Sequence, residues 1–187
     1  MLQRVMVENQ NVWITCDSKS HVQTLQAILN DLDVKNIAIV GNENVKKETA
    51  EFLQNPEAES LKYQVVISTS AIASGVSIEH NHFDFVAGFF TGSSVQPTDA
   101  YQMLGRVRQC KDFHLFADQN RRYVMDVLDA LQGKQQASVL EGSKAKITEF
   151  SLFKTELEKI RETRRSNFAN NLIWILENKK FTVKRVQ

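Results

Sequence analysis

The chain has 187 residues, 42% of them apolar, which is enough for one ordinary domain with a buried core and an extension. No stretch approaches the ~20 uncharged apolar residues of a membrane span, and the first residues lack the apolar run of a secretory signal. The two cysteines lie far apart, which disfavours a disulfide framework and a four-ligand zinc site and indicates a reducing, cytoplasmic location.

Charge divides the chain into two parts. Residues 1–118 hold nine basic and 14 acidic side chains, a net charge of −5, whereas residues 119–187 hold 14 and eight, a net charge of +6. The contrast predicts a domain over 1–118 followed by a basic extension over 119–187.

The first part alternates short β-rich runs with helical patterns. Its sequence predicts helices from a cap at Asp17 or Ser18 through Leu32, over 45–53 and over 98–108. The predicted strands lie at 12–15, 36–40, 63–68, 83–90 and 113–116. Strands that are apolar on both faces and alternate with helices predict an α/β fold, a parallel sheet covered on both sides. In such a sheet, ligands bind beyond the carboxyl ends of the strands, where the polar loops of this sequence fall.

The extension has a helical character. A helix is predicted over 123–131, a polar linker over 132–147, and one long helix or a helical hairpin over 148–178 with a break at Asn170-Asn171. Its apolar residues pack on the first part or on a partner helix. Its basic residues could bind nucleic acid, with stacking by the aromatic residues; the alternative places the aromatics in the core and the charges on a solvated face. The aromatics concerned are Tyr123, Phe168 and Trp174.

Three polar segments follow or precede the predicted strands. They read TCDSKS over 15–20, STSAIASGVSIE over 68–79 and QPTDAYQMLGRVRQ over 96–109. Hydroxyls and free amides at a helix start can bind an anion, or can simply cap the helix. Gly75 would allow a positive φ or a close approach to the backbone.

The third segment carries two of the nine basic residues of 1–118, Arg106 and Arg108. On a continuous helix, Gln102, Arg106 and Gln109 would share one face. If the helix ended near Gly105, both arginines would instead project from its last turn. Arginine suits the grip of a phosphate through its planar fork, whereas the plainer interpretation is a surface pair.

Together, the order and spacing of these segments resemble the second RecA-like lobe of superfamily 2 helicases. The first resembles motif IV, the second motif V and the third motif VI, over residues 12–118. The GRVR form of motif VI is most similar to replication helicases of the herpesvirus origin-binding-protein type and to primase–helicase proteins of plasmids and phages. The resemblance implies a RecA-like fold.

The resemblance also implies a nucleotide site. Arg106 and Arg108 would reach the γ-phosphate as arginine fingers, and Arg106, directly after the motif glycine Gly105, is the favoured one. Gln102 would couple the lobes to ATP. Gly75, Ser77 and Gly105 would lie near the nucleotide. The Asp that many members carry in motif V is replaced here by Ser77, and a second motif VI arginine often found three residues after the first is here Gln109.

A nucleic-acid site is implied in the same way. Thr69 and Ser70 of motif V would contact the backbone of a single strand, as would Ser18 and Ser20 of motif IV. The expected strand is DNA rather than RNA, which fits a nucleoid-associated location.

Half of an ATPase site is missing from the sequence. There is no GxxxxGK[ST] loop, and no two acidic residues are adjacent, so there is no DExx motif to hold Mg²⁺. ATP and Mg²⁺ are therefore expected to be shared with an N-terminal RecA-like lobe of the same parent protein, this chain supplying no metal ligand. The chain alone is expected to be inactive.

The expected function is that of the C-terminal motor lobe of an ATP-dependent helicase or translocase in replication of a plasmid, phage or similar element. The alternative is a non-catalytic module that binds nucleic acid or a protein partner through a RecA-like shell. Other candidate residues are assigned plainer roles: His80 and His82 a solvated turn, His114 the core, and Cys16 a buried small residue.

Overall fold

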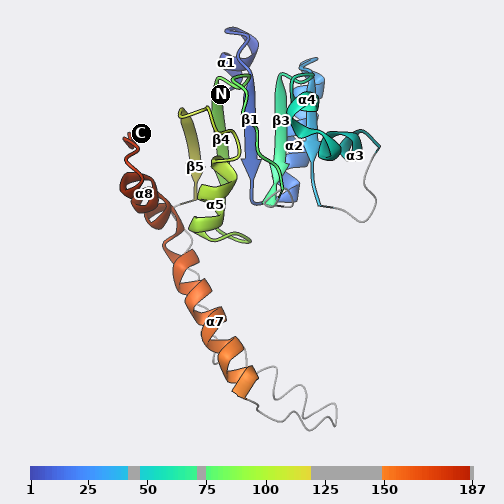
Figure 1. The fold of residues 1–187 in the computed structure, drawn as a ribbon. Helices are drawn as coiled ribbons and strands as arrows, with labels where there is room; N and C mark the ends of the chain where they lie inside the picture. The colour runs from blue at the N-terminus through green and yellow to red at the C-terminus, as the bar shows by residue number, and fades with distance from the viewer. Residues whose placement is uncertain (42–46, 71–74, 119–148, 186–187) are drawn as a thin grey trace.

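The computed structural model describes residues 1–41, 47–70, 75–118 and 149–185 (Figure 1). Its centre is a five-stranded sheet in the order β2-β3-β1-β4-β5, with every neighbouring pair parallel. The strands are β1 (Val12–Cys16), β2 (Asn36–Ile39), β3 (Val65–Thr69), β4 (Phe85–Phe90) and β5 (Phe113–Ala117). All five predicted strands are confirmed, and the arrangement is the RecA-like α/β fold that the motifs implied.

Helices cover both faces of this sheet. The described helices are α1 (Leu2–Met6), α2 (Lys19–Asp31), α3 (Lys47–Gln54), α4 (Pro56–Ser60), α5 (Pro97–Leu104), α7 (Glu149–Ser166) and α8 (Phe168–Asn178), of which α7 does not lie on the sheet. Among the described residues, no helix has the length and apolarity needed to cross a membrane.

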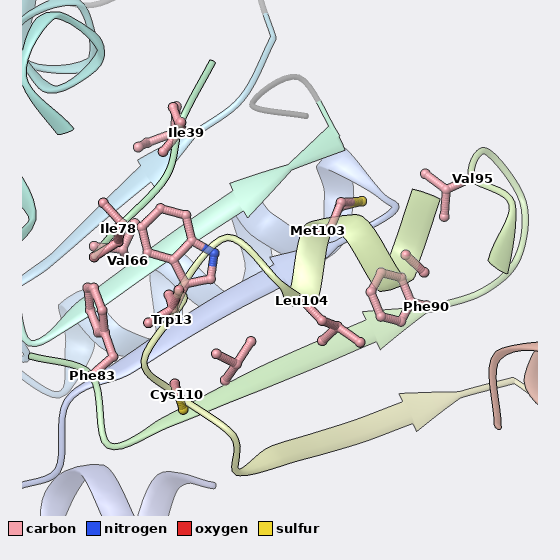
Figure 2. Packing of buried hydrophobic residues seen from close by; sticks show 14 of the residues in the cluster. Trp13, Ile39, Val66, Ile78, Phe83, Phe90, Val95, Met103, Leu104 and Cys110 are labelled. Atoms are coloured by element: carbon pink, nitrogen blue, oxygen red, sulfur yellow. The ribbon is translucent and has the colours of Figure 1, made fainter. Parts of the chain in front are cut away.

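Alternating side chains build two cores, one on each face. On the face of α3, α5 and α8, the fully buried ring of Trp13 packs with Val66 and Val86, as Figure 2 shows in part. On the opposite face, Ile14 and Ile67 pack against α2. Parallel strands buried on both sides explain why the sequence shows continuous apolar runs instead of strict alternation.

The extension is a pair of helices, with its break at Asn167 and not at Asn170-Asn171. The helix α8 packs on α5 and the sheet, where the ring of Phe168 lies 5.8 Å from that of Phe90. The helix α7 instead projects away from the sheet (Figure 1). The helix predicted over 123–131 and the linker over 132–147 lie outside the described residues, as does Tyr123.

Two short helices were not predicted. The helix α4 begins at Asn55, whose side chain accepts a hydrogen bond from the Ala58 amide, with Pro56 in the first turn. An asparagine cap followed by proline is a known helix start, so this signal was present in the sequence. The helix α1 has no capping side-chain hydrogen bond, and five residues give too little periodicity to detect.

A glycine fixes the contact between the sheet and α8. Gly92, after β4, has φ of +69°, and a Cβ at this position would lie 2.9 Å from Cβ of Phe168. We therefore expect Gly92→Ala to lower the free energy of unfolding by about 1–3 kcal/mol, through both strain and overpacking. Urea unfolding followed by circular dichroism measures this.

Gly105→Ala is the matched control. Gly105 has φ of −78°, and the nearest atom to a Cβ there is 3.5 Å away. We expect a change within about 0.5 kcal/mol. Equal losses in the two variants would show that the Gly92–Phe168 contact does not limit stability.

Candidate nucleotide and strand sites

The segments that resemble motifs V and VI meet over one face of the sheet. After Gly75 the chain passes across this face, and Ile78 forms an isolated parallel bridge with Val107. The amide of Ile78 donates to the Arg106 carbonyl at 2.8 Å, and the amide of Arg108 donates to the Ile78 carbonyl at 2.9 Å. Both Ile78 and Val107 are buried in the core beneath, so the backbone of the two motifs is held together.

This bridge explains an error in the sequence analysis. The helix predicted over 98–108 ends at Leu104, with Gly105 as its cap, so Gln102, Arg106 and Gln109 do not share a helical face. The alternative, arginines that project beyond the helix end, is confirmed. The chain leaves the helix at Gly105, and the hydrogen bonds to Ile78 then replace the helical ones.

Arg106 is the more enclosed of the two arginines. Its Nη1 donates to the carbonyl of Val76 at 3.1 Å, while its buried Nε has no hydrogen-bond partner among the described residues. Burial, with a smaller contribution from the nearby Arg108, lowers the pKa of the Arg106 guanidinium. Arginine nevertheless stays protonated in proteins, so the group is a partly desolvated cation.

Arg108 is exposed and lies in a chain of polar contacts. Its Nε donates to Ser77 Oγ at 3.1 Å, and the Ser77 hydroxyl donates to Glu79 Oε1 at 2.8 Å. No local pattern singles out Glu79, because its role arises from a turn that brings motif V alongside motif VI. Ser77 thus lies beside Arg108, and its place near a nucleotide stays a prediction.

The other nucleotide-site candidates surround this junction. Gly75 has φ of +90° and open space where a Cβ would stand, so the positive φ expected for it is confirmed. Gln102 is exposed in the last turn of α5, just before Gly105. Residues 71–74 of motif V lie outside the described residues.

The candidate residues for binding a nucleic-acid strand lie elsewhere, at the carboxyl edge of the sheet. Thr69 at the end of β3 is in register with Cys16 at the end of β1, so Thr69 and exposed Ser70 neighbour the turn into α2. In that turn the hydroxyls of Ser18 and Ser20 are 2.7 Å apart. These four residues lie beyond the carboxyl ends of the strands, where ligands commonly bind in parallel sheets, whereas Arg106 and Arg108 stand over the face of the sheet.

Asp17 has a role that the sequence analysis missed. Of the two predicted caps of α2, Ser18 and not Asp17 occupies the cap position, and it makes no side-chain cap bond. The buried Asp17 carboxylate instead accepts from the Thr91 amide at 2.9 Å, the Thr91 hydroxyl at 3.0 Å and the Ser93 amide at 3.3 Å. The Ser94 hydroxyl donates to the Asp17 carbonyl. Asp17 therefore ties the motif IV turn to the loop after β4.

Removing this carboxylate is expected to weaken the fold. Asp17→Ala leaves the Thr91 amide without its acceptor and removes one of the two acceptors of the Ser93 amide, so we expect a loss of about 1.5–3 kcal/mol in unfolding free energy. Thermal and urea unfolding measure it. Asp31→Ala, at an exposed position on α2, is the control, with an expected change within about 0.5 kcal/mol. A similar small change for Asp17 would contradict this role.

The histidines are bound within the fold. His80 Nε2 lies 3.0 Å from Ser60 Oγ and 3.3 Å from Glu57 Oε2, and His82 Nε2 lies 3.0 Å from the Tyr63 carbonyl. Both rings are half-buried and have hydrogen-bond partners, so the turn expected for them is solvated only in part. His114 was expected in the core, but its side chain is 39% exposed on the edge strand β5. Within the described ranges no three potential metal-ligating side chains cluster.

Cys16 is fully buried at the end of β1, as expected. Burial, and to a smaller degree the charge of Asp17, raises the pKa of its thiol to about 12. A thiol of this pKa is a weak nucleophile at neutral pH. Cys16 is therefore a packing residue.

Comparison with known proteins finds relatives that match only part of the chain. No protein-family model matches the chain. Proteins named as members of a helicase/primase complex in African swine fever virus, from isolate Warthog/Namibia/Wart80/1980 and strain Badajoz 1971 Vero-adapted, are each 28% identical over 107 residues. The match spans 57% of this chain but only 10% of those proteins. It supports a helicase-related role.

Solved structures of helicase lobes are similar at low identity. The Pyrococcus furiosus Hef helicase domain has a TM-score of 0.44 and 14% identity, over 71% of this chain and 26% of that one. The C-terminal domain of the DEAD-box protein Dbp5 has a TM-score of 0.44 and 16% identity, over 68% and 69%. The C-terminal part of the Fun30 ATPase domain has a TM-score of 0.44 and 16% identity, over 80% and 44%. We take no residue role from these likenesses.

Proposed function

We propose that this chain is the C-terminal motor lobe of an ATP-dependent superfamily 2 helicase or translocase. It would act in DNA replication of a plasmid, phage or similar element of the herpesvirus origin-binding or plasmid replication type. An N-terminal RecA-like lobe of the same parent protein would complete it, and this chain alone would be inactive. The observation that carries the proposal is the enclosed Arg106 guanidinium, held between motifs V and VI with one donor unmatched.

An unmatched buried donor on a cation favours an anionic ligand. The Nε of Arg106 has no acceptor among the described residues, and burial has already removed part of its hydration. A phosphate oxygen would supply that acceptor in a charge-assisted hydrogen bond. Arg108 beside it adds a second positive charge. The pair therefore fits the role of neutralising the charge that develops on a transferring phosphoryl group.

The described residues would supply one flank of the ATP site. Arg106 and Arg108 would face the γ-phosphate, and Ser77 would orient Arg108 through its hydroxyl. Gly75, Gly105 and Gln102 would line the approach to them. Mg²⁺ and the P-loop lysine would come from the N-terminal lobe. Hydrolysis of ATP supplies the free energy that opens and closes the cleft between the lobes.

The carboxyl edge of the sheet would hold the nucleic acid. Ser18 and Ser20 offer hydroxyls at the start of α2, whose free amides also favour an anion, and Thr69 and Ser70 offer hydroxyls next to them. These donors suit the backbone phosphates of single-stranded DNA. Because the two sites lie on different parts of one rigid sheet, a movement of the lobe around ATP would also move the bound strand.

Binding of single-stranded DNA by this chain tests the proposed nucleic-acid site at the carboxyl edge of the sheet. Replacing Ser18 and Ser20 together by glutamate places negative charge against the phosphates, so we expect about tenfold weaker binding of a labelled single-stranded DNA 20-mer. The control is Thr24→Glu, also on α2 and exposed. Fluorescence anisotropy measures both, with an RNA 20-mer alongside to check the expected preference for DNA.

Equal binding by the double variant and the control would contradict the strand site. The alternative, a non-catalytic binding module, would be favoured by two results together. The double variant would lose binding of single-stranded DNA, and the longer parent protein would hydrolyse no ATP.

A further inference from the structure

The projecting helix α7 carries an exposed apolar stripe. Phe153, Leu157 and Ile160 are 60%, 37% and 46% exposed, although α8 behind them buries Phe168, Leu172 and Leu176 in the core. Figure 1 shows α7 leaving the sheet, so the sheet does not cover this stripe. Of the two packing modes expected for the extension, packing on the first part holds for α8, whereas no described element covers the stripe of α7.

The spacing of this stripe is that of a coiled-coil seam. From Phe153 to Leu157 is four residues and from Leu157 to Ile160 is three, and in the sequence Phe150 precedes Phe153 by three. Alternating steps of three and four assign Leu157 to heptad position a, and Phe153 and Ile160 to position d. A two-helix seam buries these positions on both partners.

Charges beside the seam select the partner. Glu156 occupies position g and Arg161 the following position e, and both are exposed. In a parallel pair of identical helices, position g of one faces the next position e of the other, so Glu156 meets Arg161 of the second copy. By sequence, Glu149 and Lys154 stand in the same relation. In an antiparallel pair, g would face g and e would face e, which brings like charges together.

We propose that α7 pairs in parallel with α7 of a second copy of this chain. The seam runs from the start of α7 to Ile160. It ends there because Arg164, the next position a, turns to the lobe, where its Nη1 donates to Gln96 Oε1 at 3.4 Å. A parallel pair places the two lobes at the same end of the seam, so the two copies would stand side by side. A seam this short forms a weak dimer that depends on concentration.

Charge reversal on the whole chain tests the pairing. Sedimentation equilibrium over about 1–500 µM gives the dissociation constant by mass action. Glu156→Arg alone and Arg161→Glu alone each set like charges face to face twice in the dimer, and we expect at least a tenfold weaker dimer from each. The double reversal restores opposite charges and is expected to return the constant to within threefold of the original. Glu162→Arg, at the position opposite the seam, is the matched control.

Cross-linking tests the orientation separately. Leu157→Cys places two thiols across a parallel seam, so oxidation is expected to give a covalent dimer, whereas Glu162→Cys is expected to give none. Circular dichroism confirms that each variant is folded.

The proposal is overturned if the chain stays monomeric over the whole range, or if single reversals leave the dimer unchanged. It is also overturned if Leu157→Ala lowers monomer stability, which would show that the stripe is covered within its own chain.

Discussion

Arg106→Ala is expected to lower strand-stimulated ATP hydrolysis by the longer parent protein by at least about a hundredfold, with ATP and the strand still bound. The reason is the position of Arg106 at the junction of motifs V and VI, where its enclosed guanidinium has one buried donor with no acceptor in the part of the chain that the structure describes. A desolvated, positioned cation stabilises developing phosphoryl charge more than a solvated one does. Initial rates at saturating ATP and strand measure the effect.

The neighbouring arginine serves as the internal comparison. Arg108 is exposed and bound to Ser77, so we expect Arg108→Ala to lose less, about tenfold. Arg106→Lys keeps the charge but loses the planar fork, so its rate of ATP hydrolysis should stay near that of Arg106→Ala. Lys111→Ala, an exposed residue nearby, should keep full activity. Full activity in Arg106→Ala and Arg108→Ala alike would show that these arginines serve structure alone.

The largest expected change in stability is that of Trp13→Ala. Trp13 is fully buried on β1, and its ring meets that of Phe83 edge-on with 5.5 Å between centroids. Removing it leaves a cavity between the sheet and the segment that carries Ile78, so we expect a loss of about 3–5 kcal/mol in unfolding free energy. A typical domain has only about 5–15 kcal/mol, so the variant should be close to unfolding.

The second tryptophan of the chain is a matched control. Trp174 on α8 is 65% exposed, and we expect Trp174→Ala to change stability by no more than about 0.5 kcal/mol. Urea unfolding followed by circular dichroism compares both variants with the same signal. A loss in Trp13→Ala as small as that in Trp174→Ala would contradict the buried core on this face.

The strands were predictable because each is apolar on both faces and ends at a polar turn. That pattern is local, and it also identified the three motif segments. The end of α5 was harder to predict: residues 105–108 fit a helical pattern, and only the bridge between Ile78 and Val107 decides against it. That bridge joins segments about 30 residues apart in sequence, which no local pattern can reveal.

Asp17 shows the same limit at the site. An aspartate before a helix is a common cap, and no local pattern pairs it with Thr91. The two meet because β1 and β4 are neighbours in the sheet, so that their ends coincide. In the extension, Phe168 and Trp174 were both candidates for base stacking, but their opposite exposures follow from how α8 lies on α5.

The most direct test of the central claim is the rate of ATP hydrolysis by the longer parent protein, with and without single-stranded DNA. The account predicts hydrolysis that the strand stimulates, and none from this chain alone, because the P-loop and the metal-binding carboxylates would lie on the other lobe. A longer protein that binds the strand but hydrolyses no ATP under any condition would contradict the claim that this chain is half of a motor.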